Sequence, residues 1–153
     1  MRYTDFLAAH DETFCPFCAP AQRMFMQNDS AFLTYAIAPY HPHHLLVVPT
    51  RHVLSMLEMN ISEVDALWQL IRDGMKVLRS LGYEDYTVLV REGKVGEVKS
   101  VAHLHYHIVP NTHIGDLDHK GEERRIMTDE ETKALTMEIR QAMETLVSKE
   151  ENK

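Results

Sequence analysis

Residues 101–110 read Val-Ala-His-Leu-His-Tyr-His-Ile-Val-Pro, in which three histidines alternate with apolar, strand-favouring residues. The alternation predicts a β-strand whose successive side chains point to opposite faces. His103, His105 and His107 would then share one face, with neighbours about 6.5–7 Å apart along the strand. Because imidazole titrates near neutral pH, this row offers a nucleophile, a proton carrier or a metal ligand. A single strand histidine is usually a surface residue, but three in register opposite an apolar face predict a functional site.

The length and composition indicate one ordinary globular domain. A chain of 153 residues can bury a substantial core, so we predict a single domain over residues 1–153. We find no apolar stretch of about 18 residues and no apolar secretory core near the N-terminus, and we therefore expect a cytoplasmic protein without a membrane span. The net charge of −7 argues against nucleic acid or an anionic membrane as a partner.

The two cysteines, Cys15 and Cys18, are separated by two residues. A redox pair would follow a strand, and the preceding residues 10–13, His-Asp-Glu-Thr, make a poor one. Two thiolates at this spacing can instead bind one metal ion from a single turn. Taken alone, the pair leaves a metal half-site and two incidental thiols equally open.

Apolar runs that end at prolines or polar loops predict further strands at residues 31–38, 45–48 and 86–91. Residues 21–26 are expected to be a short helix or loop. The polar segment 92–99 is too short for a crossover helix, so the strand at 86–91 should pair antiparallel with the histidine strand.

Two helices complete the predicted fold. Residues 62–81 carry an apolar stripe that we expect to be core, with Ser62 as N-cap and Gly82 just past the end. The stripe consists of Val64, Leu67, Trp68, Ile71, Met75 and Leu78. A second helix should begin at the capping-box pair Thr128 and Glu131. The fold class is therefore α+β: an antiparallel sheet with one long central helix and a C-terminal helix packed on it.

The histidine run resembles the signature of the histidine triad (HIT) superfamily. Two other segments match the family in order: Cys-Pro-Phe-Cys at 15–18, and Pro-Tyr-His-Pro-His-His-Leu-Leu-Val-Val-Pro-Thr-Arg-His at 39–52. The motif-bearing core spans about 15–110, and a loop and helix follow over 111–149. The resemblance implies a HIT-like fold, a nucleotide substrate and a homodimer.

What the resemblance further implies is hydrolysis or nucleotidyl transfer at the α-phosphate of a dinucleoside polyphosphate or nucleoside phosphoramidate, breaking a P–O or P–N bond. His105 would be the nucleophile and form a nucleotidyl-histidine, while His107 and His44 would hydrogen-bond the phosphate and the leaving group. The resemblance implies that Ser100, His105 and His107 contact the phosphate. Arg91 and Lys99 depart from the family pattern, which often has asparagine and glutamine at these positions. We assign both cations to phosphate binding, where they would favour a longer polyphosphate leaving group; the alternative is that they are simply solvated.

In zinc-bearing relatives the first histidine of the row is a metal ligand. The resemblance therefore implies a closed, structural zinc site of the Cys₂His₂ type rather than a catalytic one. Its ligands would be Cys15, Cys18, His52 and His103. If no metal is bound, His52 is simply a surface residue.

Two other interpretations stay open. Ala36 stands where many relatives have an acidic or amide residue that grips the ribose, which favours a nucleotide-binding or scaffold protein with little turnover. The second interpretation is a metalloenzyme in which all three histidines bind one metal ion. Strand neighbours about 6.5 Å apart do not converge easily on one ion, which argues against it. Four further histidines receive no role and are mostly expected at the surface: His41, His43, His113 and His119.

Overall fold

The computed structural model describes residues 14–18, 24–94, 101–112 and 126–152, together with residues 2, 5, 8 and 9. It contains two compact units, Met1–Ile114 and Gly115–Lys153, which are described separately below. Within the described part of the chain, neither long helix has an apolar stretch sufficient to cross a bilayer.

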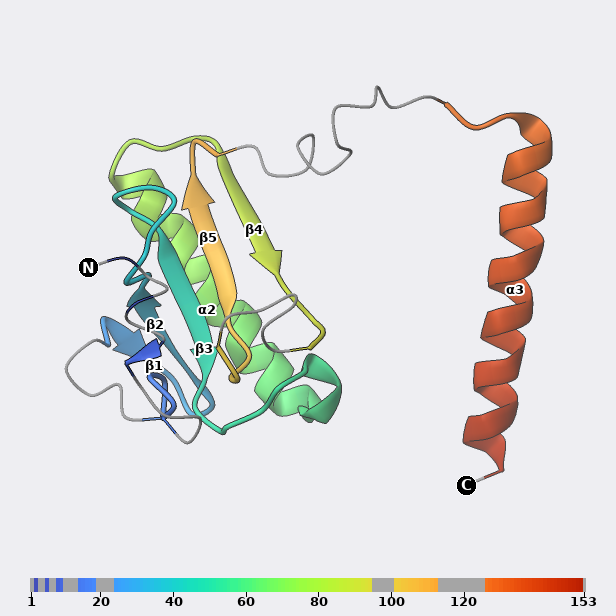
Figure 1. Ribbon diagram of the computed structural model, residues 1–153, viewed down its shortest axis with the longest axis horizontal. Coiled ribbons are helices and arrows are strands. Elements are labelled where there is room, and N and C mark those ends of the chain that lie inside the picture. The colour runs from blue at the N-terminus through green and yellow to red at the C-terminus, as the bar shows by residue number, and fades with distance from the viewer. Residues whose placement is uncertain are drawn as a thin grey trace. The chain divides into compact units, whose positions relative to one another are not determined.

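The first unit is built on a five-stranded sheet in the order β1-β2-β3-β5-β4 (Figure 1). Every neighbouring pair is antiparallel, including the pairing of β4 with β5 that the short intervening loop predicted. The α+β class and the antiparallel sheet are thus confirmed. The strands are β1 (Met26–Gln27), β2 (Ala31–Tyr35), β3 (Leu45–Pro49), β4 (Tyr86–Val90) and β5 (Tyr106–Pro110).

The histidine strand is shorter than predicted. Strand β5 begins at Tyr106, so only His107 of the three histidines belongs to it. The backbone N–H of Leu104 donates to the carbonyl of Val53 at 2.7 Å, beyond the end of β3, instead of joining the sheet ladder. The expectation of three histidines along one continuous strand was therefore wrong. Two smaller differences are that β2 ends at Tyr35 rather than at residue 38, and that β1 was not predicted.

Helix α2 (Ile61–Ser80) lies across one face of the sheet (Figure 1). Its N-cap is Asn60 and not Ser62: the Asn60 side chain accepts from the N–H of Glu63, and the Glu63 carboxylate accepts from the N–H of Asn60. This reciprocal capping box satisfies two backbone donors at once, which a cap at Ser62 would not do. Gly82 follows the helix with φ of 92°, as its predicted role as a stop requires.

The face of the sheet under α2 carries the main core. The helix contributes Leu67, Ile71 and Leu78, which are fully buried. Trp68 was predicted in this core but is 42% exposed. Its ring packs edge-to-face on Tyr106 and lines an open cavity of about 570 Å³, because it lies at the margin of the apolar stripe rather than at its centre.

The opposite face of the sheet holds a smaller apolar cluster. Phe32, Leu46 and Val48 are buried there together with Phe17, from the cysteine turn, and Val101. Leu46 is the register partner of His107, and side chains alternate along each strand. His107 therefore projects from this face, away from α2.

The second unit contains helix α3 (Asp129–Glu151). The N–H of Thr128 donates to the Glu131 carboxylate at 2.8 Å and the N–H of Glu131 donates to the Thr128 hydroxyl at 3.2 Å, which confirms the capping box. Among its described side chains, Leu135, Ile139 and Met143 are exposed within the unit. The expected packing of this helix on the sheet stays a prediction.

Candidate functional site

A buried pair of histidines lies at the centre of the site. His44 is the residue before β3 and His107 is on β5, and their Nε2 and Nδ1 atoms are 2.9 Å apart. The backbone N–H of Tyr40 donates to Nδ1 of His44 at 3.2 Å, so the His44 proton must be on Nε2. That Nε2–H then donates to Nδ1 of His107, which leaves the His107 proton on its own Nε2. One hydrogen-bond chain thus assigns both tautomers.

Both members of this pair are neutral at physiological pH. Burial, followed by the nearby His105, lowers the pKa of His44 to about 4. Burial also lowers the pKa of His107 to about 3, with smaller contributions from His105, His44 and Arg91. Burial and nearby positive charges both destabilise the protonated form of an imidazole, and its pKa therefore falls. His107 can therefore donate a hydrogen bond from Nε2–H to an anion without itself being charged. Both nitrogens of His44 are already bonded within the protein, so His44 supports His107 instead of donating to the phosphate or leaving group itself.

His105 directly precedes β5 and adjoins His107, with ring centroids 4.8 Å apart. Its Nδ1 is 2.8 Å from the carbonyl oxygen of His103, which can only accept, so the proton of His105 is on Nδ1. The lone pair of the neutral ring is then on Nε2, the atom that a nucleophilic imidazole would use.

Arg91 and Tyr40 border the buried pair. Arg91 follows β4, and its Nη2 donates to the Tyr40 hydroxyl at 3.3 Å. The Tyr40 ring stacks on the His44 ring, with centroids 5.4 Å apart and planes at 19°. The predicted phosphate-binding Arg91 is therefore close to the histidines, whereas Ser100 and Lys99 lie outside the described residues.

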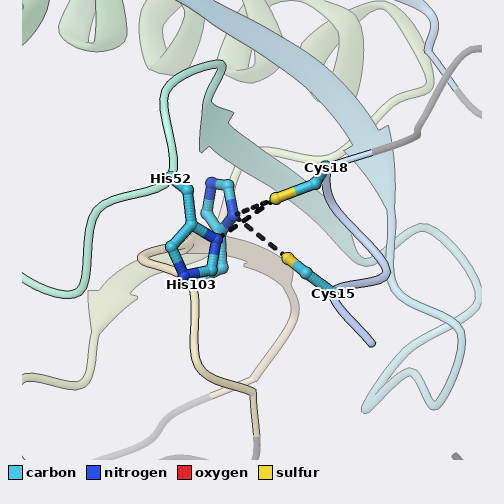
Figure 2. A group of neighbouring side chains, drawn as sticks. All are labelled: Cys15, Cys18, His52 and His103. Atoms are coloured by element: carbon cyan, nitrogen blue, oxygen red, sulfur yellow. Dashed lines mark hydrogen bonds between the residues drawn. The ribbon is translucent and has the colours of Figure 1, made fainter. Parts of the chain in front are cut away.

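The four predicted metal ligands come together in one cluster. Ligand atoms of Cys15, Cys18, His52 and His103 all lie within 4.8 Å of one another (Figure 2). Nδ1 of His103 is 3.3 Å from the Cys15 sulfur, and Nδ1 of His52 is 3.2 Å from the Cys18 sulfur. Nε2–H of His103 donates to the carbonyl of Pro49 at 2.8 Å, so the lone pair on Nδ1 faces the sulfurs.

This donor set fits a zinc ion. Partial desolvation and the adjacent Cys15 raise the pKa of Cys18 to about 11, because a thiolate there would lie beside a second sulfur. A bound divalent cation removes that penalty by ionising both thiols. Two sulfurs and two imidazole nitrogens would supply all four ligands that such an ion takes in a structural site, with no position left for a substrate.

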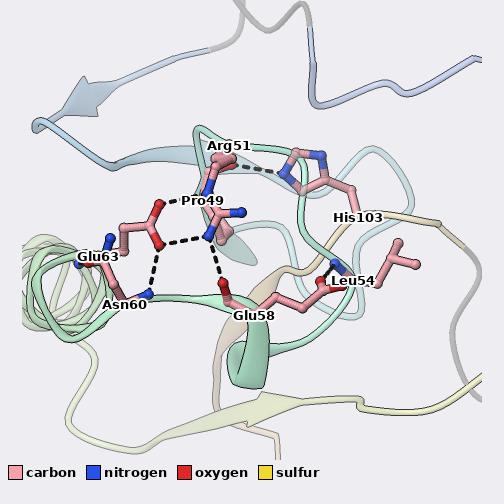
Figure 3. A network of polar contacts seen from close by, with 7 residues as sticks. All are labelled: Pro49, Arg51, Leu54, Glu58, Asn60, Glu63 and His103. Atoms are coloured by element: carbon pink, nitrogen blue, oxygen red, sulfur yellow. Dashed lines mark hydrogen bonds and ion pairs between the residues drawn. The ribbon is translucent and has the colours of Figure 1, made fainter.

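A polar network holds the segment that carries His52 (Figure 3). Arg51 binds the Glu63 carboxylate through Nε at 2.8 Å and Nη2 at 2.9 Å, and Nη2 also donates to the carbonyl of Glu58. The Arg51 guanidinium lowers the pKa of Glu63 to about 2. Because Glu63 also caps α2, this bidentate pair ties the turn after β3 to the start of the helix.

Phe17 lies between the candidate metal cluster and the candidate nucleophile, a position that no sequence motif predicted. This buried ring lies 5.7 Å from the His103 ring, edge-on, and 5.3 Å from the His105 ring. The cysteine turn therefore packs against the candidate nucleophile as well as carrying two of the candidate metal ligands. In the sequence, the only indication of this contact is that an aromatic residue lies between Cys15 and Cys18.

A family model described as the HIT domain matches residues 20–114, well over half of the chain. The chain belongs to the HIT domain family. An uncharacterized HIT-like protein of Methanocaldococcus jannaschii is 27% identical over 128 residues, which cover 79% of this chain and 98% of that protein. The adenosine 5′-monophosphoramidase of Schizosaccharomyces pombe is 34% identical over 74 residues, covering 48% of this chain and only 53% of that enzyme.

Solved structures agree on the fold of this HIT domain. The histidine triad nucleotide-binding protein of Candida albicans superposes with a TM-score of 0.70 at 16% identity, over 87% of this chain and 99% of that one. At this identity the likeness concerns the fold alone. The resemblance noted from the histidine, cysteine and proline motifs is confirmed.

Proposed function

We propose that this HIT domain is a nucleotide hydrolase or nucleotidyl transferase that attacks an α-phosphate with Nε2 of His105. The observation that carries the proposal is the 2.8 Å contact from Nδ1 of His105 to the carbonyl of His103, which directs the lone pair to Nε2. Neutral imidazole is a competent nucleophile near neutral pH. The Schizosaccharomyces pombe relative, named as a monophosphoramidase, supports chemistry at a nucleotide phosphorus.

In the first step a bond forms between Nε2 of His105 and the α-phosphorus while the bond to the leaving group breaks. A phosphate leaving group departs as an anion, whereas an amine takes a proton from water. Nε2–H of His107 is assigned to the phosphoryl oxygen, whose growing charge it stabilises by a hydrogen bond. In the second step water or another acceptor attacks the phosphorus, releases His105 and yields its proton to solvent.

The leaving group is either an amine or a phosphate chain. Arg91 adds a cation beside the buried pair, and its contact with Tyr40 keeps that charge at the margin of the site. Fixed positive charge favours anionic leaving groups, so we expect dinucleoside polyphosphates to be cleaved as well as phosphoramidates. Arg91, Lys99 and Ser100 remain the proposed phosphate ligands.

The bound metal, the oligomeric state and the location of this HIT protein are also proposals. Zinc is proposed at Cys15, Cys18, His52 and His103, where it would hold the cysteine turn against the core. A homodimer and a cytoplasmic location are proposed from the family resemblance. Sedimentation at micromolar concentration measures the oligomeric state directly.

The test is intact-mass analysis after brief incubation with nucleoside phosphoramidates and dinucleoside polyphosphates. We expect a mass increase of one nucleotidyl group, located on His105 by peptide mapping, and none in His105→Asn. The His105→Asn variant should keep its affinity for the nucleotide. Nucleotide binding by the wild-type protein without adduct or turnover would support the alternative, a binding or scaffold module, which Ala36 favours.

A further inference from the structure

Residues 39–44, the second part of the loop between β2 and β3, decide how His44 is oriented. The His44 N–H donates to the carbonyl of His41 at 2.9 Å, which closes a turn inside the loop. The ring of His44 is bound through Nδ1 to the backbone N–H of Tyr40. Because that donor belongs to the loop itself, any shift of the loop backbone moves or breaks the bond that assigns the His44 tautomer.

Tyr83 reaches this loop from the end of helix α2. The N–H of Gly82 donates to the carbonyl of Arg79 and the N–H of Tyr83 donates to the carbonyl of Leu78, at 3.0 and 3.2 Å. This is a Schellman motif, and the φ of 92° at Gly82 belongs to it. The motif gives Tyr83 a defined backbone position immediately after a rigid helix.

The Tyr83 side chain contacts His41 and His43, two of the four histidines that had no assigned role. Its hydroxyl is 2.6 Å from Nδ1 of His43, and its ring meets the His41 ring edge-to-face with centroids 5.2 Å apart. The N–H of His43 donates to Nδ1 of His41 at 3.1 Å. His41 and His43 are thus parts of one cluster with Tyr83; His43 is exposed, as expected, and His41 is half-buried.

We propose that Tyr83 is a positioning residue that acts through His43 on His44 and keeps the His44–His107 pair in its hydrogen-bonded arrangement. The Tyr83 hydroxyl bonds Nδ1 of His43 at 2.6 Å, the backbone joins His43 to His44, and Nε2 of His44 bonds Nδ1 of His107 at 2.9 Å. The expected effect of Tyr83 on turnover rests on the proposed function. Its expected effect on the orientation of His44 does not.

The test is Tyr83→Phe, which removes the hydroxyl and keeps the ring that packs on His41. Imidazole ¹H–¹⁵N spectra report the ring nitrogens of His44. We expect the slowly exchanging Nε2–H signal of His44 to weaken and its nitrogen shifts to move toward those of a mobile ring. If the protein turns over a nucleotide, kcat should fall about tenfold with KM changed less than about twofold, because a small misplacement of a reacting group is costly.

Tyr86→Phe is the matched control, since Tyr86 lies on β4 and outside the cluster. His43→Ala should reproduce the effect of Tyr83→Phe, and the double variant should be no worse than either single one, while His43→Gln, which can still bond the hydroxyl, should retain most of the activity. Wild-type His44 signals and wild-type kcat in Tyr83→Phe would overturn the proposal. If even the wild-type protein shows no turnover, the proposed function fails, and the spectra alone decide the role of Tyr83.

Discussion

Three histidines of one short segment acquire different chemistry from the atom that each bonds. His103 donates from Nε2 to Pro49 and faces the cysteine sulfurs with Nδ1. His105 donates from Nδ1 to the carbonyl of His103, and His107 accepts at Nδ1 from His44. In each ring, the hydrogen-bond partner of one nitrogen sets the tautomer and so decides which nitrogen carries the lone pair. The roles of the histidine row are therefore assigned by backbone and side-chain neighbours, and not by the imidazole itself.

At this scale we predict that His44 and His107 make stability depend on pH. Their pKa values of about 4 and 3 in the fold lie below the ordinary value of 6.5. At these two histidines the unfolded chain therefore binds more protons than the folded protein. The free energy of unfolding falls as the pH drops from about 6.5 toward 4. Between pH 7 and pH 5 each histidine should account for on the order of 2 kcal/mol.

Urea unfolding at the two pH values measures this loss. His107→Gln has no proton to take up at that position, so its loss between pH 7 and pH 5 should be smaller than that of the wild-type protein. An equal loss in both proteins would show that other groups cause the pH dependence.

At the scale of elements, close packing of α2 on the sheet depends on Gly74. A Cβ placed at Gly74 would lie 2.6 Å from Cδ1 of Ile108 and 3.3 Å from Cδ1 of Leu33, both of which are buried side chains. The glycine therefore lets the helix approach β2 and β5, and a larger residue must push the helix away or repack the core.

We predict that Gly74→Val lowers the free energy of unfolding by about 1–3 kcal/mol, the usual cost of overpacking. The matched control is Gln69→Val, which places the same β-branched side chain at an exposed position of the same helix. Chemical denaturation compares the two variants. A cost for Gly74→Val no larger than that of the control would mean that the core accommodates the added atoms.

At the scale of the first unit, the cysteine turn and the histidine segment form one assembly. Phe17 contacts the rings of His103 and His105, and Arg51 ties the segment of His52 to the start of α2. Residues far apart in the sequence thus meet around the proposed zinc ion. Loss of that ion should loosen the support of His105 without removing any candidate catalytic residue.

We predict that the purified protein holds about one zinc ion per chain and that its removal by a strong chelator lowers the Tm. Metal content is measured by elemental analysis and Tm by calorimetry. Cobalt substitution should add the thiolate absorption of a tetrahedral site, and Cys15→Ser should weaken it. A fully folded protein with neither zinc nor cobalt uptake would count against the site.

The sequence by itself determined the segmentation of this protein: strands near 31, 45 and 86, helix α2, the capping box of α3 and the residue types of the proposed metal site. These features depend on short-range periodicity and on turn chemistry, which neighbouring residues carry. The start of β5, the exposure of Trp68, the ring nitrogens of the histidines and the contacts of Phe17, Tyr40 and Tyr83 were decided only by the tertiary structure. They depend on hydrogen bonds and packing between segments distant in the chain, such as the Cys15–His103 contact across 88 positions, and no local pattern encodes that geometry.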